Sequence, residues 1–286
     1  MQYGPAVRRR KLGTELRDLR TRVGLTSIEA ARLVGWHQSK VSRIETGSSG
    51  VKPADVCRLL DAYDVRDAEL RELLLILAGG EDGGGRQKWW HAYRGVLPAA
   101  YRDFISLESE ASGMRTLETS VVPGLLQTPD YARAVTRAAV KGVPEDKLDA
   151  LVEVRIARQD VLRADPPLKL NALLDEAVLR REIGGPAVMA RQLRQLYEAA
   201  TLPQVRLQVL PFTAGAHVGV TGPFVIFSFS SASDLDVVVL DNLTSSHYLE
   251  RKEELKAYVE AFNALQIQAL SPEESLDYIA GIAAGA

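Results

Sequence analysis

The stretch that decides the fold is TSIEAARLVGWHQSKVSRIETG, residues 26–47. It divides into two short segments of helical periodicity, residues 26–34 and about 37–45. Thr26 has a hydroxyl that can cap a free backbone N–H at the start of the first segment. Gly35 supplies the permissive backbone that a tight turn between the segments requires. The pattern therefore predicts two helices joined by a glycine turn.

The second of these segments carries a distinct polar face. At about 100° per residue, His37, Val41 and Ile44 fall on one side of a helix. The other side groups four polar residues, which are Gln38, Ser39, Ser42 and Arg43. Glutamine can pair bidentately with adenine and arginine with guanine, and serine is small enough to let a helix approach a DNA groove. This face therefore suits the edges of DNA bases.

Residues 26–47 resemble the helix-turn-helix of the lambdoid phage repressors and of the larger XRE-type regulator family. The matching residues are those of the cap, the helix contact, the turn and the core: Thr26, Ala31, Gly35, Val41, Ile44 and the terminal IETG of residues 44–47. The family usually has leucine where this chain has Ala30, and polar residues where it has Ile28 and Leu33. This departure implies either a slightly rotated first helix or an exposed Ile28.

The resemblance also implies which residues contact DNA, because the family inserts the second helix into the major groove. It assigns contacts in two groups, with Gln38, Ser39 and Arg43 on the bases and Ser27, Lys40 and Ser48 on the phosphates. His37 and Ser42 complete the predicted DNA-binding set. The resemblance further pairs Arg20 with Glu45 as a partly buried ion pair that ties the first helix of the domain to the recognition helix.

Charge is divided unevenly along the 286 residues. Residues 1–66 contain thirteen Lys or Arg and seven Asp or Glu, a net charge of +6, whereas residues 67–286 contain 22 basic and 30 acidic residues, a net charge of −8. A basic head on an acidic body suits a module that seeks phosphate, joined to one that does not. Cys57 is the single cysteine, and neither a signal peptide nor a membrane-spanning run is evident, so a cytoplasmic protein is expected.

Five helices are expected before a glycine-rich segment. Residues 1–11 are interpreted as a basic arm, either solvated or in contact with DNA, and the next helix has one apolar face formed by Leu12, Leu16, Leu19 and Val23. The fourth helix starts at Pro53 and the fifth covers residues 67–77. GGEDGGG, residues 79–85, then indicates a flexible linker. We therefore expect an all-α five-helix helix-turn-helix domain at 1–78, a linker at 79–86 and a second domain at 87–286.

The second domain mixes helical and strand-like patterns. Helical patterns cover residues 99–111, 129–140, 144–164, 186–200, 249–270 and 272–284, and strand-like runs cover 168–174, 205–210, 224–229 and 237–240. This order predicts a larger α+β domain with a small sheet covered by helices. Arg155, Arg158 and Arg163 are interpreted as a solvated face of the third helix.

Four motifs of this domain carry a second resemblance: VVPGLLQTPDYARAV at 121–135, LDEAVLRR at 174–181, VLPFTAGAH at 209–217 and SPEES at 271–275. Together they are similar to the C-terminal domain of a large actinobacterial group of antitoxin-like XRE regulators. Members of that group carry a domain of unknown function and are often encoded beside a small partner protein. The resemblance implies no settled biochemical activity for this domain.

Six residues are candidates for a ligand or partner site: Trp89, Trp90, Tyr93, Glu176, Arg180 and His217. The aromatic three either anchor the start of the second domain or line a pocket or interface. Helix capping and surface ion pairs explain the charged residues equally well. The histidines have no metal-ligand spacing and the chain has no G-x-S-x-G elbow, so no metal, no cofactor and no enzymatic activity are expected.

Three functions stay open. The first is a sequence-specific DNA-binding transcription regulator, a homodimer on two-fold related half-sites, whose second domain dimerises and senses a small protein partner or a ligand. The second is an antitoxin-type protein that mainly sequesters a small partner protein and regulates itself by binding DNA. The third is an enzyme tethered to DNA. The first is the leading hypothesis.

Overall fold

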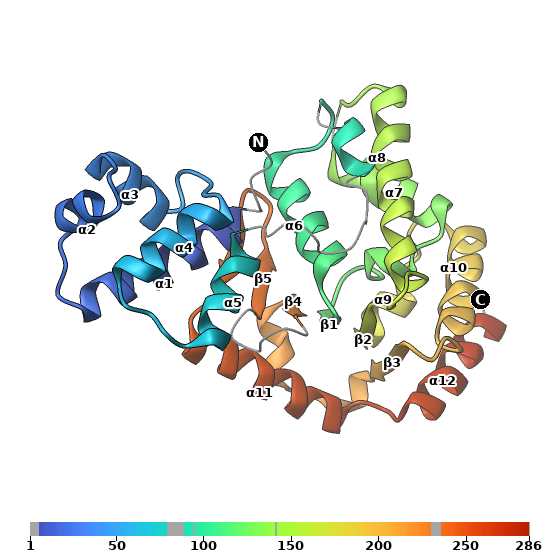
Figure 1. The fold of residues 1–286 in the computed structure, drawn as a ribbon. Helices are drawn as coiled ribbons and strands as arrows, with labels where there is room; N and C mark the ends of the chain where they lie inside the picture. The colour runs from blue at the N-terminus through green and yellow to red at the C-terminus, as the bar shows by residue number, and fades with distance from the viewer. Residues whose placement is uncertain (1–5, 79–88, 94, 141, 230–235, 286) are drawn as a thin grey trace. The chain divides into compact units, whose positions relative to one another are not determined.

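The computed structural model describes residues 6–78, 89–93, 95–140, 142–229 and 236–285. Its contacts divide the chain into two compact units, Met1–Gln87 and Lys88–Ala286. Figure 1 draws the first unit in blue and cyan and the second in green through red. The predicted linker, residues 79–86, lies outside the described residues.

The described part of the first unit is built from five helices, as expected. Their bounds are α1 Ala6–Arg22, α2 Ser27–Leu33, α3 Gln38–Glu45, α4 Pro53–Ala62 and α5 Ala68–Leu77. Each of them turns apolar residues inward, and the buried set includes Leu12, Leu16, Leu19, Ala31, Val41, Ile44, Val56, Leu59, Leu60, Tyr63 and Leu74. The single cysteine, Cys57, is half-buried on α4.

Two expectations at the ends of α1 are wrong. Residues 6–11 are helical rather than an arm, since arginine and lysine are good helix formers and Lys11 is buried next to Leu12. At the other end the helix stops at Arg22, so Val23 leaves the apolar face and is exposed. Gly24 turns the chain there with a φ of 72°.

Glycine allows α1 and α3 to approach closely. A Cβ atom on Gly13 would lie 2.5 Å from the carbonyl oxygen of Ile44 and 2.6 Å from that of Glu45. Such contacts are too short for any side chain, so the backbone of α1 touches the C-terminal end of α3 directly. Gly35, with a φ of 69°, forms the predicted turn between α2 and α3.

The second unit contains a six-stranded mixed sheet in the order β3-β2-β1-β4-β5-β6. The strands are β1 Gly113–Glu118, β2 Lys169–Asp175, β3 Val205–Leu210, β4 Phe224–Ser228, β5 Val237–Asp241 and β6 Ser246–Leu249. β1, β2 and β3 are parallel, while β4, β5 and β6 are added antiparallel. Four strands match the predicted runs. The other two, β1 and β6, were missed because polar residues interrupt them.

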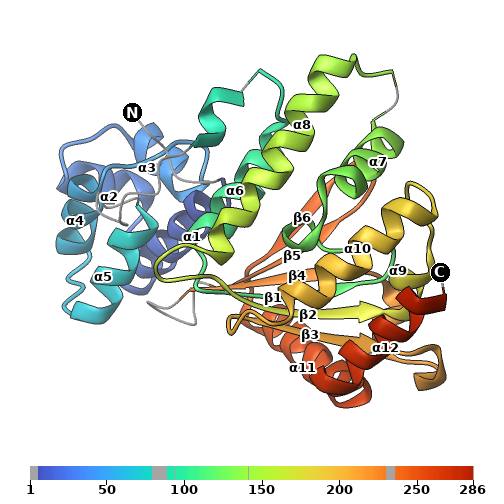
Figure 2. The same ribbon diagram turned by 90° about the vertical axis from the view of Figure 1, so that its right-hand side faces the viewer.

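Helices cover both faces of this sheet. They are α6 Ala99–Glu110, α7 Pro129–Ala139, α8 Glu145–Ala157, α9 Glu176–Arg180, α10 Pro186–Ala199, α11 Lys252–Gln268 and α12 Pro272–Gly285. In Figure 2, α8 and α10 lie above the strands, α11 lies below them and α12 lies beside the edge strand β3. On the α11 face, Phe262 and Leu265 pack with Leu117 and Leu173 of the sheet. The predicted α+β domain is confirmed.

The prediction of one helix over residues 144–164 is wrong, and so is the solvated position of Arg158, whereas Arg163 is exposed as expected. The α-helix ends at Ala157 and a 3-10 helix, η3, covers Arg158–Leu162. Arg158 is buried, and its Nε and Nη2 donate to Glu108 of α6 at 2.8 and 2.7 Å. A buried carboxylate satisfies the guanidinium, which is why a charged residue is tolerated there.

Candidate nucleic-acid interface

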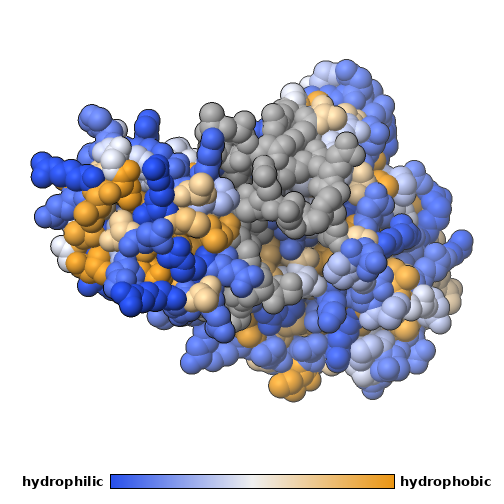
Figure 3. Space-filling view, viewed as in Figure 1, coloured by the Kyte–Doolittle hydropathy of each residue, from blue (hydrophilic) through white to orange (hydrophobic). Residues whose placement is uncertain are grey.

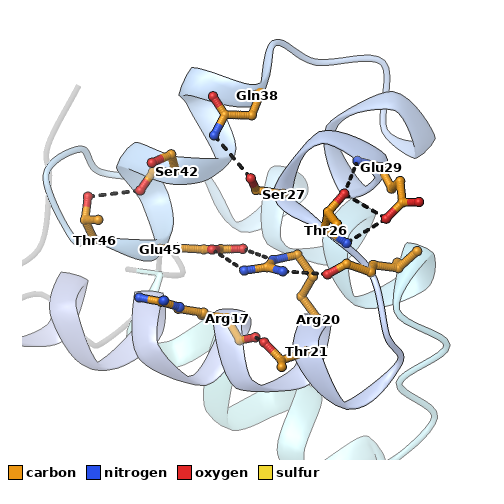
Figure 4. A network of polar contacts seen from close by, with 11 residues as sticks. Arg17, Arg20, Thr21, Thr26, Ser27, Glu29, Gln38, Ser42, Glu45 and Thr46 are labelled. Carbon is orange, nitrogen blue, oxygen red and sulfur yellow. Dashed lines mark hydrogen bonds and ion pairs between the residues drawn. The ribbon is translucent and has the colours of Figure 1, made fainter.

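A capping box starts the helix-turn-helix. The Thr26 hydroxyl accepts the Glu29 N–H at 3.2 Å, and the Glu29 carboxylate accepts the Thr26 N–H at 2.8 Å. Figure 4 shows these reciprocal bonds at the start of α2. The backbone N–H of Thr26 lowers the pKa of the Glu29 carboxyl. Two free N–H groups are thereby satisfied, so α2 has a fixed first turn.

The recognition helix α3 separates a buried face from an exposed one. Val41 and Ile44 are buried, whereas Gln38, Ser39 and Arg43 are exposed. Ser42 is half-buried at the margin of the exposed face. The expectation that His37 lies on the apolar side is wrong, because His37 is the N-cap residue and its side chain is exposed.

The N-terminal ends of α2 and α3 are joined by a side-chain hydrogen bond. Gln38 Nε2 donates to Ser27 Oγ at 3.2 Å, as Figure 4 shows. This contact links a residue predicted to read a base with one predicted to hold a phosphate. It leaves the amide oxygen of Gln38 free to accept a bond from a base, because an amide has both a donor and an acceptor end.

The predicted ion pair between Arg20 and Glu45 is confirmed. Arg20 Nε and Nη2 donate to the two carboxylate oxygens of Glu45 at 2.6 and 2.9 Å, and Nη1 donates to the Leu25 carbonyl at 2.5 Å. The bond to Glu45 raises the pKa of Arg20. Burial raises the pKa of the nearby Tyr63 hydroxyl to about 12. This bidentate pair fixes the C-terminal end of α3 to α1.

Lys40 and Ser48, both predicted to hold phosphates, lie in different surroundings. Lys40 Nζ is 2.9 Å from Asp55 Oδ2 and 3.7 Å from the centroid of the Trp36 ring. Ser48 is exposed and hydrogen-bonded to Thr46 at 2.8 Å. Asp55 and Trp36 were not predicted to take part in this site. The one sequence signal for an acidic partner is that Lys40 stands in the first turn of a helix, where the helix dipole disfavours a cation; this signal does not say which residue the partner is.

Apolar side chains are exposed beside the interface. Ile28 and Leu33 of α2 are 53% and 61% exposed, while Ala30 between them is fully buried. On the face that Figure 3 shows, orange side chains gather over the part of the first unit that contains α2. The sequence departs from the family pattern at these positions, which implied either a rotated first helix or an exposed Ile28. The structure shows the exposed Ile28.

Of the aromatic candidates of the second unit, Trp90 lies in the core, and the half-buried Trp89 and Tyr93 pack against it. Trp89, Trp90 and Tyr93 form a 3-10 helix, η1, in which the rings of Trp89 and Trp90 meet edge to face at 5.8 Å. Trp90 is buried with Ile105 of α6 and Val154 of α8. Trp90 therefore anchors the start of the second unit, and the other two rings pack around it.

Glu176, Arg180 and His217 gather at the carboxyl ends of β2 and β3. The buried Glu176 carboxylate accepts the Phe212 N–H at 2.8 Å and also binds Arg180. Despite its burial, these bonds hold the pKa of Glu176 below its ordinary value. His217 Nε2 is 4.0 Å from Asp175 Oδ2, and its buried Nδ1 has no partner among the described residues.

The quoted motifs of the second unit meet through such bonds. Ser275 of SPEES accepts the backbone N–H of Val209 at 2.9 Å, and Glu176 of LDEAVLRR accepts that of Phe212. These bonds join the segments around β2, β3 and α12. Some of the motif residues therefore hold the fold together. Within the described ranges, no group of three His, Cys, Asp or Glu residues is placed to hold a metal ion. No described helix is both long enough and apolar enough to cross a membrane.

A capped α2, a glycine turn and an α3 with an exposed polar face define a DNA-binding protein of the helix-turn-helix class. Residues 11–74 match the family described as a helix-turn-helix domain. Residues 101–281 match the family described as a domain of unknown function (DUF5753). This second match covers more than half of the chain, and the protein belongs to that family. No curated protein and no solved structure matches the chain significantly.

Proposed function

We propose that this protein is a sequence-specific transcription regulator of the XRE type that inserts α3 into the major groove of double-stranded DNA. The observation that carries the proposal is the exposed row of Gln38, Ser39 and Arg43 on a helix whose opposite face is buried. The Arg20–Glu45 pair fixes the position of this helix before binding, so the helix does not have to be reordered when it meets DNA. Ser27 and Ser48 hold phosphates on either side, and His37 and Ser42 border the base-reading row.

Replacing Arg43 tests the proposal. A bidentate contact to guanine contributes about 1–3 kcal/mol of discrimination, so Arg43→Ala should relax the preference at one base position. The measurement is the affinity of the full chain for a duplex selected from a random pool and for a shuffled duplex of the same composition. Arg66→Ala, which removes an exposed arginine paired with Asp64, is the matched control. Equal losses on both duplexes for Arg43→Ala would contradict the assignment.

The working unit in this proposal is a homodimer held chiefly by the second unit. One α3 supplies few base contacts, and specific affinities of about 10⁻⁸–10⁻¹¹ M generally need a larger footprint. A two-fold dimer reads two half-sites about 34 Å apart. Residues 1–66 carry a net charge of +6, thirteen basic against seven acidic residues, so two heads repel each other. In sedimentation, a fragment of residues 86–286 should be dimeric and one of residues 1–78 monomeric.

The second unit in this proposal senses a small protein partner or a ligand and catalyses no reaction. An open groove of about 610 Å³ supports a binding role, and its lining includes Leu179, Met189 and Leu193 together with Tyr278 and Ile282 of α12. Such a volume lies in the range of ligand-binding clefts. As a DNA-binding regulator the protein acts in the cytoplasm.

The alternative is an antitoxin-type protein of the actinobacterial XRE group, in which sequestering the small partner is primary and DNA binding is autoregulation. Purification of the full chain from its native host separates the two. A small protein that copurifies in equal amount favours the alternative, whereas a dimer without it favours the regulator. Substituting Ile282→Glu in the groove, with Ile267→Glu on the exposed side of α11 as control, tests whether the groove holds that partner.

A further inference from the structure

We propose that Lys40 is a positioning residue, which clamps the N-terminal part of α3 to α4 and to the turn, and is not a phosphate contact. The inference rests on the proposed DNA-binding function and changes the role of one residue within it. It starts from two contacts of the ammonium group: the ion pair with Asp55 at 2.9 Å and the Trp36 ring at 3.7 Å.

The direction of the Lys40 side chain follows from its place on α3. At about 100° per residue, the base-reading row from Gln38 to Arg43 spans roughly 140°, and Lys40 lies about 130° from its centre. Lys40 is therefore next to the buried Ile44 on the helix circumference. A lysine at that position reaches α4 and the turn more readily than the groove that Arg43 faces.

Helix electrostatics favour the same arrangement. Lys40 stands in the first turn of α3, where the partial positive charge of the helix end disfavours a cation. Asp55 stands in the first turn of α4, where a carboxylate is favoured. The ion pair offsets the unfavourable position of Lys40, and the face of Trp36 adds a cation–π contact. A phosphate would compete with both partners for the ammonium group.

The clamp completes the support of the recognition helix. Arg20 holds Glu45, the last residue of α3, to α1, and Lys40 holds the first turn of α3 to α4. With both ends fixed, the angle at which Gln38 and Arg43 meet the base edges is set before DNA arrives. Loss of the clamp should therefore reduce the preference for the right sequence more than it reduces affinity for DNA in general.

The experiment compares the full chain with Lys40→Met, Asp55→Asn and the double variant. Each is measured on a duplex that the wild-type chain selects from a random pool and on a shuffled duplex, over a series of salt concentrations. The selectivity ratio, the affinity for the first duplex over that for the second, is the main readout. Thermal unfolding fixes a temperature at which every variant is folded.

The clamp predicts that each single variant lowers the selectivity ratio by about threefold to tenfold, and that the double variant is no worse than either. Lys40→Met should leave the salt dependence on the shuffled duplex unchanged. A phosphate contact predicts the opposite: equal losses on both duplexes, a salt slope smaller by about 0.9 for each head, and an Asp55→Asn variant that binds as well as the wild type or better.

Asp55→Asn decides the matter even where Lys40→Met is unstable, because it keeps every positive charge. An unchanged selectivity ratio in Asp55→Asn overturns the clamp. Failure of the wild-type chain to select any duplex would instead overturn the proposed DNA-binding function, so the two failures are distinguishable.

Discussion

Each unit contains a buried, bidentate arginine–carboxylate pair, and the two pairs join different elements. Arg20 and Glu45 join α1 to the recognition helix, with side chains 11% and 6% exposed. Arg158 and Glu108 join η3 to α6, with side chains 6% and 1% exposed, and Tyr101 accepts a further bond from Arg158 at 2.8 Å. The first pair orients the helix that we propose to face DNA, whereas the second holds η3 against α6. The same chemistry therefore serves positioning in one unit and stability in the other.

The pair in the second unit should give the largest effect. Glu108→Ala leaves the Arg158 guanidinium buried without its counter-charge, so the free energy of unfolding of the second unit should fall by about 3–5 kcal/mol. Denaturant unfolding followed by the fluorescence of Trp89 and Trp90, in a Trp36→Phe background, measures it, because those two residues lie in that unit. The double variant Glu108→Leu with Arg158→Met should recover most of the loss. A single-variant loss below about 1 kcal/mol would mean that the pair is effectively solvated.

The pair in the first unit should cost less, because it is closer to solvent. Arg20→Met should lower the stability of the first unit by about 2–4 kcal/mol, between the values for buried and exposed pairs. It should also weaken binding to the selected duplex, since the C-terminal end of α3 loses its tie to α1. Glu108→Ala, measured below its unfolding transition, should leave that binding unchanged. If both variants weaken DNA binding equally, the division of roles between the pairs is wrong.

Glu118, at the end of β1, shows what a partly buried carboxyl does without such a pair. It accepts the Thr116 hydroxyl at 3.2 Å, and burial raises its pKa to about 7. Between its ordinary pKa and this one, the folded state holds a proton that the unfolded state has lost, so stability falls as the pH rises. From about pH 5 to about pH 8 the second unit should lose about 2 kcal/mol. Glu118→Gln should remove this decline, and an identical decline in both proteins would contradict it.

The two units also differ in how far the sequence predicts them. The first unit is governed by local spacing: a cap at Thr26, a turn at Gly35 and a family motif that pairs Arg20 with Glu45. In the second unit the decisive contacts are distant in sequence, as between Glu108 and Arg158. An arginine run on a helical pattern is equally consistent with a solvated face, so nothing local revealed that Arg158 is buried.

The same limit explains the missed central strand. GMRTLE, which forms β1, has an arginine, a threonine and a glutamate among its six residues. It forms a strand because β2 and β4 pair with it on both sides and because Asp236 lies near the Arg115 guanidinium. At the candidate DNA-binding site, the exposed row of α3 followed from periodicity. The contacts of Lys40 with Asp55 and Trp36 did not follow from periodicity, because the ion pair depends on where α4 is placed.

Two capping boxes give the smallest and best matched comparison. Thr26 and Glu29 start α2, and Ser271 and Glu274 start α12 with bonds of 3.1 and 2.8 Å. Thr26→Ala and Ser271→Ala should each cost about 1 kcal/mol in the stability of their own unit. In both boxes a backbone N–H holds the pKa of the glutamate below its ordinary value, so the contribution is present near neutral pH and is lost on acidification.

The two cap substitutions should differ in their effect on DNA. Thr26 precedes Ser27, whose hydroxyl accepts the Gln38 amide, so fraying of the first turn of α2 releases a predicted base-reading side chain. Thr26→Ala should therefore weaken binding to the selected duplex by about threefold to tenfold, while Ser271→Ala leaves it unchanged. Titration of both variants at one temperature measures this. Equal binding would show that Gln38 does not depend on α2, and the hydrogen bond to Ser27 would then have no part in recognition.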